Sequence, residues 1–155
     1  GLAVTGHSLG GGVGGLAMMD LAQRGWKIEE AYTFGMPRTG NEHFARDFNR
    51  RFSDVFHRVT HHMDPVVHVP PSDLVTNWHF QHVEPELFFD GKVGQGSIVC
   101  AADGDGQCSG QYSDVLHDLF HLGDHMDYMD IQIGTLGCGR LSTDGLARPE
   151  GNASL

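Results

Sequence analysis

The chain has 155 residues, which is enough for one domain with a hydrophobic core. Ten Lys and Arg residues against 20 Asp and Glu residues give a formal net charge of −10, which disfavours nucleic acid and anionic membranes as partners. No segment reaches the roughly 18 consecutive apolar residues of a membrane-spanning helix, so we expect no transmembrane segment.

The first residues predict a strand followed by a helix. Residues 2–5 form a short apolar run that is typical of a buried parallel strand. The helix that follows is expected to end near Gly25 and to present an apolar face with Leu16, Met19 and Leu21. Its many glycines each cost about 0.5–1 kcal/mol relative to Ala, which close packing against a sheet would offset. The chain opens as a strand already under way, so we expect further protein before Gly1.

The next elements continue the same alternation. Strands are predicted over residues 31–34 and 55–60, with a helix over residues 42–51 between them. The order strand, helix, strand, helix, strand implies an α/β fold with a mostly parallel sheet and flanking helices. For the rest of the chain we expect an extended segment over residues 77–90, a loop over 91–111, a short helix over 113–122 and a polar tail after Cys138.

The cysteines point to an oxidising compartment. Cys100 and Cys108 bracket a polar, glycine-rich segment, and this spacing suits a small loop closed by a disulfide. Cys138 is left without a partner in this sequence, so it is either a free thiol or the partner of a cysteine upstream. A cysteine metal site is less favoured because the chain has no CxxC pair. The tail carries one N-glycosylation sequon at Asn152.

Gly6-His7-Ser8-Leu9-Gly10 matches the pattern G-x-S-x-G between the predicted strand and helix. A sharp strand-to-helix turn holds the serine in a strained conformation, and we expect side chains at both glycine positions to collide with neighbouring elements. The hydroxyl of Ser8 would then project beyond the carboxyl end of the sheet, where the backbone N–H of Leu9 faces a developing oxyanion. The pattern therefore predicts a serine nucleophile, with a glycine-rich turn and an incidental serine as the alternative.

A nucleophilic serine needs a base oriented by an acid, and in this fold class the order along the chain is Ser, Asp or Glu, His. Asp64 follows the third strand and precedes Pro65, which ends the strand. Asp54 lies before that strand and so at the wrong end of the sheet. Asp73 is a reserve candidate. The alternative for Asp64 is a turn residue that binds only its own backbone.

The base is harder to choose. We favour His125, which follows Gly123 and is expected on a loop. His117, His121 and His125 recur every four residues and would share one face of a helix, which raises a metal site as an alternative. Gly123 and the lack of completing thiolates or carboxylates disfavour that site. The histidine candidates after Asp64 are His68, His79, His82, His117, His121 and His125.

Taken together, these motifs resemble those of the fungal-type class 3 lipases, a branch of the α/β-hydrolases. The resemblance implies Ser8 as nucleophile, Asp64 as acid and His125 as base. It also implies that Cys100 pairs with Cys108 and that Cys138 pairs with a cysteine near the N-terminus. The motifs that carry it run in family order: Val4 to Gly11, Tyr32 to Gly35 with Pro37-Arg38, Gly40-Asn41 and Phe44-Ala45, Arg58 to His61 with Asp64 to Val66 and His68 to Pro71, and Asp124-His125 with Tyr128.

By this resemblance, residues 1–139 form the C-terminal part of the catalytic domain and residues 140–155 a polar tail. The family's N-terminal strands, lid helix and second oxyanion donor precede the turn that carries the serine, here called the elbow (Gly6 to Gly10), and none lies within these 155 residues. Losing one oxyanion donor typically costs ~10²–10³ in turnover, so the isolated segment is expected to be a poor catalyst. The family's helix after the serine is usually rich in Ala, whereas this one is rich in Gly.

The implied activity is hydrolysis of a carboxylic ester through an acyl-enzyme, without a metal or other cofactor. A secreted triacylglycerol lipase acting on lipid at an oil–water interface is the first expectation. A feruloyl-type esterase or a phospholipase of the same fold is the alternative within this enzyme class. A truncated non-catalytic relative and a His-rich metal protein are the alternatives outside it.

Overall fold

The computed structural model describes residues 1–71, 79–91, 95–101, 106–112 and 119–133. Several predictions concern residues outside these ranges, and the structure does not bear on them. They are the predictions for Asp73, residues 77–78, residues 113–118 with His117, Cys138, and the tail over 140–155 with its sequon at Asn152.

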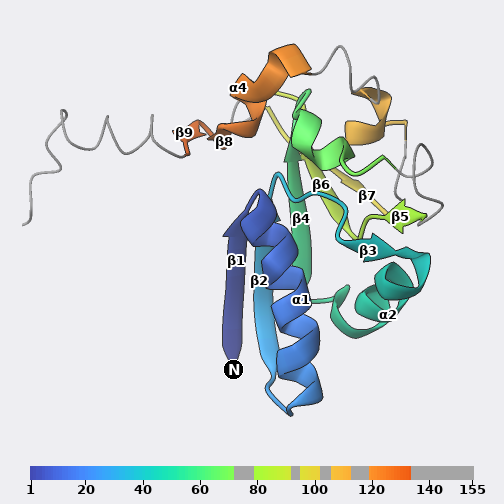
Figure 1. Cartoon of the computed structure of the whole chain (residues 1–155). Coiled ribbons are helices and arrows are strands. Elements are labelled where there is room, and N and C mark those ends of the chain that lie inside the picture. Colours follow the sequence, from blue (N-terminus) through green and yellow to red (C-terminus); the bar gives the residue numbers. More distant parts are fainter. Residues whose placement is uncertain (72–78, 92–94, 102–105, 113–118, 134–155) are drawn as a thin grey trace, which may run out of the picture.

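A five-stranded sheet forms the centre of the molecule (Figure 1). Its spatial order is β1-β2-β4-β6-β7, and every neighbouring pair is parallel except β6 with β7. The predicted α/β fold with a mostly parallel sheet is therefore confirmed. The strands are β1 (Leu2–His7), β2 (Ile28–Phe34), β4 (Phe56–His61), β6 (Glu86–Phe89) and β7 (Ile98–Cys100).

Two longer helices connect the parallel strands. Helix α1 (Leu9–Gln23) follows β1 and lies over β1 and β2, and helix α2 (Glu42–Phe52) precedes β4 (Figure 1). The side chain of Asn41 caps α2 by accepting a hydrogen bond from the N–H of Phe44 at 3.1 Å. Among the described residues, no helix has the length and apolar character needed to cross a membrane.

Shorter elements surround the carboxyl ends of the strands. Helix α4 (Leu122–His125) lies beyond the end of β4 (Figure 1). The others are β3 (Gly40–Asn41) paired with β5 (Phe80–Gln81), β8 (Asp127–Tyr128) paired with β9 (Ile131–Gln132), and the 3-10 turns η1 (Pro65–His68), η2 (Ser109–Tyr112) and η3 (Leu119–His121).

Glycines, rather than leucines, form the buried face of α1. Gly11 and Gly15 face the turn after β2, where an added Cβ would lie 3.0 Å from Met36 Cβ and 3.2 Å from Met36 Cε, respectively. Leu16, predicted on the apolar face, is instead 51% exposed. The glycine-rich sequence is thus explained by the short distance between helix and sheet, as expected. Of the predicted apolar face, Met19 and Leu21 are partly buried and pack against the core, so the prediction was wrong only for Leu16.

The segment over residues 91–111 is not the loop that was predicted. It contains strand β7 and the turn η2. Strand β7 forms because its residues pair antiparallel with the edge strand β6. Cys100, the last residue of β7, forms a disulfide with Cys108, and both side chains are buried against Phe88. The predicted pairing of these two cysteines agrees with the structure.

An ion pair lies buried between β4 and β6. Arg58 Nη2 donates to Glu86 Oε2 at 2.9 Å, and the two side chains are 1% and 2% exposed. Thr60 Oγ1 and the N–H of Ser109 donate to the other carboxylate oxygen. Burial opposes ionisation of Glu86, but the charge of Arg58 and the hydrogen bonds from Ser109 and Thr60 outweigh it and lower the pKa of Glu86. The pair is therefore ionised at neutral pH.

We expect Glu86→Gln to lower the free energy of unfolding by about 3–5 kcal/mol, since it leaves the Arg58 guanidinium buried without its counter-charge. The glutamine keeps a carbonyl oxygen for Thr60 and Ser109, so the change isolates the charge. The measurement is the midpoint of urea unfolding at constant slope.

Adding Arg58→Met to Glu86→Gln should recover much of the loss, because no charge then remains buried. The exposed pair of Arg24 and Asp20, 2.8 Å apart, serves as the control, and Asp20→Asn should have a far smaller effect. Purely additive losses in the Arg58 and Glu86 variants would contradict coupling between the two charges.

Candidate functional site

Ser8 lies at the turn between β1 and α1, with a backbone φ of 58°. A positive φ is uncommon for a residue with a side chain, and such strained conformations are frequent at functional sites. A Cβ on Gly6 would lie 2.3 Å from the carbonyl oxygen of Gly10, so only glycine fits at position 6. A Cβ on Gly10 would meet no described atom within 4 Å. The prediction that a side chain would collide is therefore confirmed at Gly6 and was wrong at Gly10.

The predicted acid, base and nucleophile lie in one hydrogen-bonded chain. His125 Nε2 is 2.8 Å from Ser8 Oγ, and His125 Nδ1 is 2.9 Å and 3.0 Å from the two carboxylate oxygens of Asp64. Because a carboxylate only accepts, Nδ1 carries the proton, and Nε2 is left to accept from the serine hydroxyl. The arrangement can therefore activate Ser8 as a nucleophile.

Asp64 is fully buried and held from three sides. Besides His125, its carboxylate accepts from the N–H of Val66 at 2.8 Å and from Tyr128 Oη at 2.5 Å. Burial, followed by the charge and hydrogen bond of Asp64, raises the pKa of Tyr128 well above its ordinary value. The phenol therefore stays protonated and donates its hydrogen to the carboxylate.

His7 contacts His125 through a hydrogen bond and through its ring. Its Nε2 donates to the backbone carbonyl of His125 at 2.8 Å, and the two rings lie 4.5 Å apart between centroids. Burial is the main reason that the pKa of His7 falls below its ordinary value. The ring is thus neutral at neutral pH and places no second positive charge beside a protonated His125.

Gly35, directly after β2, allows the acid and base to approach the sheet. Its φ is 59°, and an added Cβ would lie 2.8 Å from Asp64 Oδ2 and 2.9 Å from His125 Nδ1. No side chain fits in this space without displacing the pair. The sequence offered a signal here, because Gly35 belongs to one of the quoted motifs, but it gave no reason for the glycine.

Among the residues that the structure describes, the other acid and base candidates take no part in this hydrogen-bonded chain. Asp54 is exposed and precedes β4, at the opposite end of the strand from Ser8. His82 is buried and contacts the carbonyl of Val67, and burial lowers its pKa well below the ordinary value. His68 is buried in η1, His79 is exposed before β5, and His121 lies in η3.

His125 itself lies at the end of α4 and not on a loop, and Gly123 is part of that helix. Its Nε2 contacts Ser8 and its Nδ1 contacts Asp64, so it does not join His121 in the metal site considered from the sequence. Tyr128 and His7 hold the acid and the base, and sequence spacing alone gave them no such roles.

Leu9 is the first residue of α1, whose first N–H groups have no acceptor within the helix. With the positive end of the helix dipole, such groups favour an anion beside Ser8. A backbone N–H at this position can donate to the oxyanion that forms when a serine attacks a carbonyl.

Comparison with known proteins connects this site to a family. Residues 1–74 match the family described as Lipase (class 3). The chain is 42% identical over 88 residues to secreted mono- and diacylglycerol lipase 1 of Fusarium solani, an alignment that covers 57% of this chain and 25% of that protein. It is 33% identical over 138 residues to secreted mono- and diacylglycerol lipase 2 of Gibberella zeae, covering 77% of this chain and 33% of that protein.

Among solved structures, lipase II from Rhizopus niveus superposes with a TM-score of 0.72 at 31% identity. The match covers 88% of this chain and 49% of that one. The chain therefore spans less than half the length of each of these three relatives.

We expect Gly35→Ala to slow the reaction of Ser8 with an organophosphonate, a reagent that modifies activated serines, by about 100-fold. The added methyl group would displace Asp64 and His125, and a misplacement of about 1 Å can cost 10²-fold. The rate of covalent labelling, followed by mass spectrometry, measures the effect.

Gly25→Ala is the matched control, since Gly25 also has a positive φ, of 87°, but an added Cβ there meets nothing within 4 Å. Both variants carry the backbone cost of alanine in this region, about 1–2 kcal/mol. Equal labelling rates in the two variants would mean that Gly35 does not set the position of the acid and base.

Proposed function

Because the chain belongs to the fungal-type class 3 lipases, we propose that it carries the catalytic triad of a carboxylic-ester hydrolase, with Ser8 as nucleophile, His125 as base and Asp64 as acid. The observation that carries the proposal is the hydrogen-bonded chain from Ser8 Oγ through His125 to Asp64. A serine hydroxyl is a weak nucleophile unless a base in this position takes its proton.

The reaction proceeds in two acyl transfers. Ser8 Oγ attacks the ester carbonyl carbon while His125 Nε2 takes the hydroxyl proton, and the carbonyl oxygen becomes an oxyanion that the Leu9 N–H stabilises. His125 then gives its proton to the leaving alcohol as the ester C–O bond breaks. A water molecule, deprotonated by His125, attacks the acyl-enzyme; as the bond between the acyl carbon and Ser8 Oγ breaks, His125 returns the proton to Oγ, and the carboxylic acid is released.

Asp64 acts on the base throughout. Its carboxylate fixes the tautomer with hydrogen on Nδ1 and stabilises the imidazolium that forms in each step. His7 and Tyr128 act as positioning residues, because one holds the backbone of His125 and the other holds the carboxylate of Asp64. No step of this reaction requires a metal or another cofactor.

For the whole protein, we propose acylglycerols as the substrates and secretion as the destination. The relatives from Fusarium solani and Gibberella zeae are both named as secreted mono- and diacylglycerol lipases. The disulfide between Cys100 and Cys108 supports an oxidising compartment.

In the full-length protein, Ser8→Ala should lower kcat for hydrolysis of a chromogenic ester on the order of 10⁶-fold, because it removes the nucleophile. Asp64→Asn should lower it about 10⁴-fold, because the imidazole then loses its correct tautomer. Initial rates at saturating ester measure both effects.

Ser97→Ala, at an exposed serine before β7, is the matched control and should retain full activity. Circular dichroism checks that each variant folds. Turnover by a folded Ser8→Ala variant within tenfold of the parent would exclude Ser8 as the nucleophile.

The substrate class has a test of its own. We expect emulsified mono- and diacylglycerols to be hydrolysed faster than a phospholipid or a feruloyl ester of matched concentration, with triacylglycerol as the comparison within the acylglycerols. Titration of released acid gives the rates. Faster turnover of the phospholipid or the feruloyl ester would reject the acylglycerol proposal while leaving the triad intact.

A further inference from the structure

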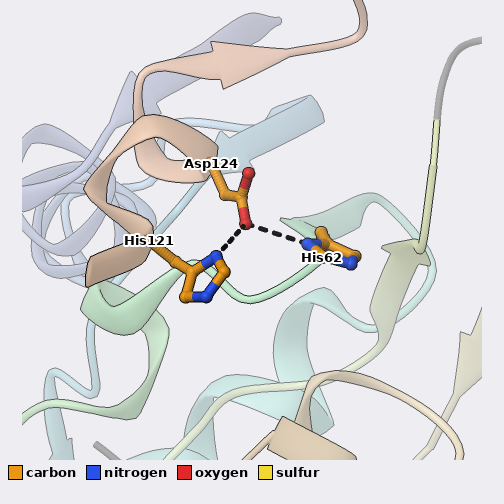
Figure 2. Close-up of side chains that lie close together, drawn as sticks. All are labelled: His62, His121 and Asp124. Carbon is orange, nitrogen blue, oxygen red and sulfur yellow. Dashed lines mark hydrogen bonds and ion pairs between the residues drawn. The ribbon is translucent and has the colours of Figure 1, made fainter. Parts of the chain in front are cut away.

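A second group of titratable side chains lies beside the proposed triad but does not belong to it. His62 follows β4, and His121 and Asp124 lie in η3 and α4, 59 and 62 residues further along the chain. Figure 2 shows both imidazoles turned toward the same carboxylate. We refer to His62, His121 and Asp124 as the Asp124 cluster.

The distances in this cluster are close to those between the ligands of one metal ion. Asp124 Oδ2 is 2.9 Å from His62 Nδ1 and 3.6 Å from His121 Nδ1, and the three ligand atoms all lie within 4.8 Å of one another. Tetrahedral zinc with bonds of about 2.0–2.1 Å separates its ligand atoms by roughly 3.3 Å. The two separations that involve Asp124 therefore lie within about half an ångström of this value, and the separation between the two imidazole nitrogens is at most 4.8 Å.

The surroundings fix the carboxylate and leave access to it. The N–H of Met63 is 3.3 Å from Asp124 Oδ2, and His61 Nδ1 is 3.3 Å from the backbone carbonyl of Asp124. The three side chains of the cluster are 25–36% exposed, so an ion can enter and water can complete its coordination.

His62 is held in position by an uncommon backbone conformation. Its φ is 41°, in the left-handed region that residues with side chains seldom adopt. Such conformations persist where the surrounding structure determines them, and they are frequent at ligand sites. The turn after β4 thereby presents the imidazole to Asp124.

We propose that the Asp124 cluster is a binding site for a divalent transition-metal ion, with zinc as the best match. Two imidazole nitrogens and one carboxylate oxygen form a ligand set that zinc takes in sites with an open water position, whereas calcium and magnesium prefer oxygen ligands alone. The site goes beyond the proposed function, because none of its ligands is Ser8, Asp64 or His125.

A bound ion would connect the two segments that carry the acid and the base of the proposed hydrolase site. His62 belongs to the turn that carries Asp64, and Asp124 directly precedes His125. The ion would replace the hydrogen bond between His62 and Asp124 by coordination bonds across this junction, so zinc should raise the thermal unfolding midpoint.

The test uses the untagged full-length protein after removal of metals with a chelator. We expect cobalt(II) to give the intense visible absorption of a tetrahedral site and zinc to displace it at one ion per chain. His121→Gln and His62→Asn should each weaken zinc binding at least about tenfold in calorimetry, since even the loss of a residue behind a ligand costs 10–100-fold. Asparagine suits the positive φ at position 62.

His43→Gln is the matched control, because His43 is an exposed histidine of α2 that lies 3.6 Å from the Glu42 carboxylate. It should bind zinc as the parent does. Ser8→Ala should also keep full zinc affinity, so the metal site and the proposed hydrolase activity can fail separately.

Circular dichroism confirms that the variants are folded. The absence of a tetrahedral cobalt spectrum, or unchanged zinc affinity in both His62→Asn and His121→Gln, would overturn the site. An equal loss of affinity in His43→Gln would assign the binding to scattered surface histidines and would also overturn it.

Discussion

The buried carboxylate of Asp64 sets the main constraint on this end of the molecule. A charge without exposure to water is costly unless hydrogen-bond donors surround it. The donors come from the turn after β4, through Val66, and from the α4–β8 segment, through His125 and Tyr128. That segment must therefore pack against the end of β4, and by doing so it brings Nε2 of His125 to Ser8.

The approach of these segments depends on glycines. Gly6 and Gly35 each lie where a Cβ would come within 3 Å of an atom of the elbow or of the acid–base pair, and Gly11 lets α1 pack closely against the turn after β2. Glycine loses more conformational entropy on folding than other residues, and close packing offsets this loss at positions where no other residue fits. Substitutions at these positions should affect the triad geometry before they affect the sheet.

Local sequence patterns predicted the parallel sheet, both long helices, and Ser8 and Asp64 as proposed nucleophile and acid, because apolar runs, the G-x-S-x-G motif and Pro65 act over short distances along the chain. His125 was chosen as the base for a loop position, whereas it lies at the end of α4. The local patterns did not predict β7, since a three-residue strand is defined by its partner β6. They also placed Leu16 inward, because hydrophobicity alone does not reveal that glycines form the contact. The contact between His62 and Asp124 crosses 62 residues, and spacing carries no information on it.

The position of the base depends on directed polar contacts more than on hydrophobic packing. The segment around α4 leaves Phe120, Leu122 and Ile131 exposed at 89%, 52% and 65%, so these side chains add little to its docking. Polar contacts hold the segment: His125 and Tyr128 contact Asp64, Asp124 contacts the turn after β4, and His7 donates to the carbonyl of His125. Hydrogen bonds specify distance and angle where apolar contact does not. A base that must meet Ser8 within tenths of an ångström is therefore better positioned by this junction than by a larger apolar interface.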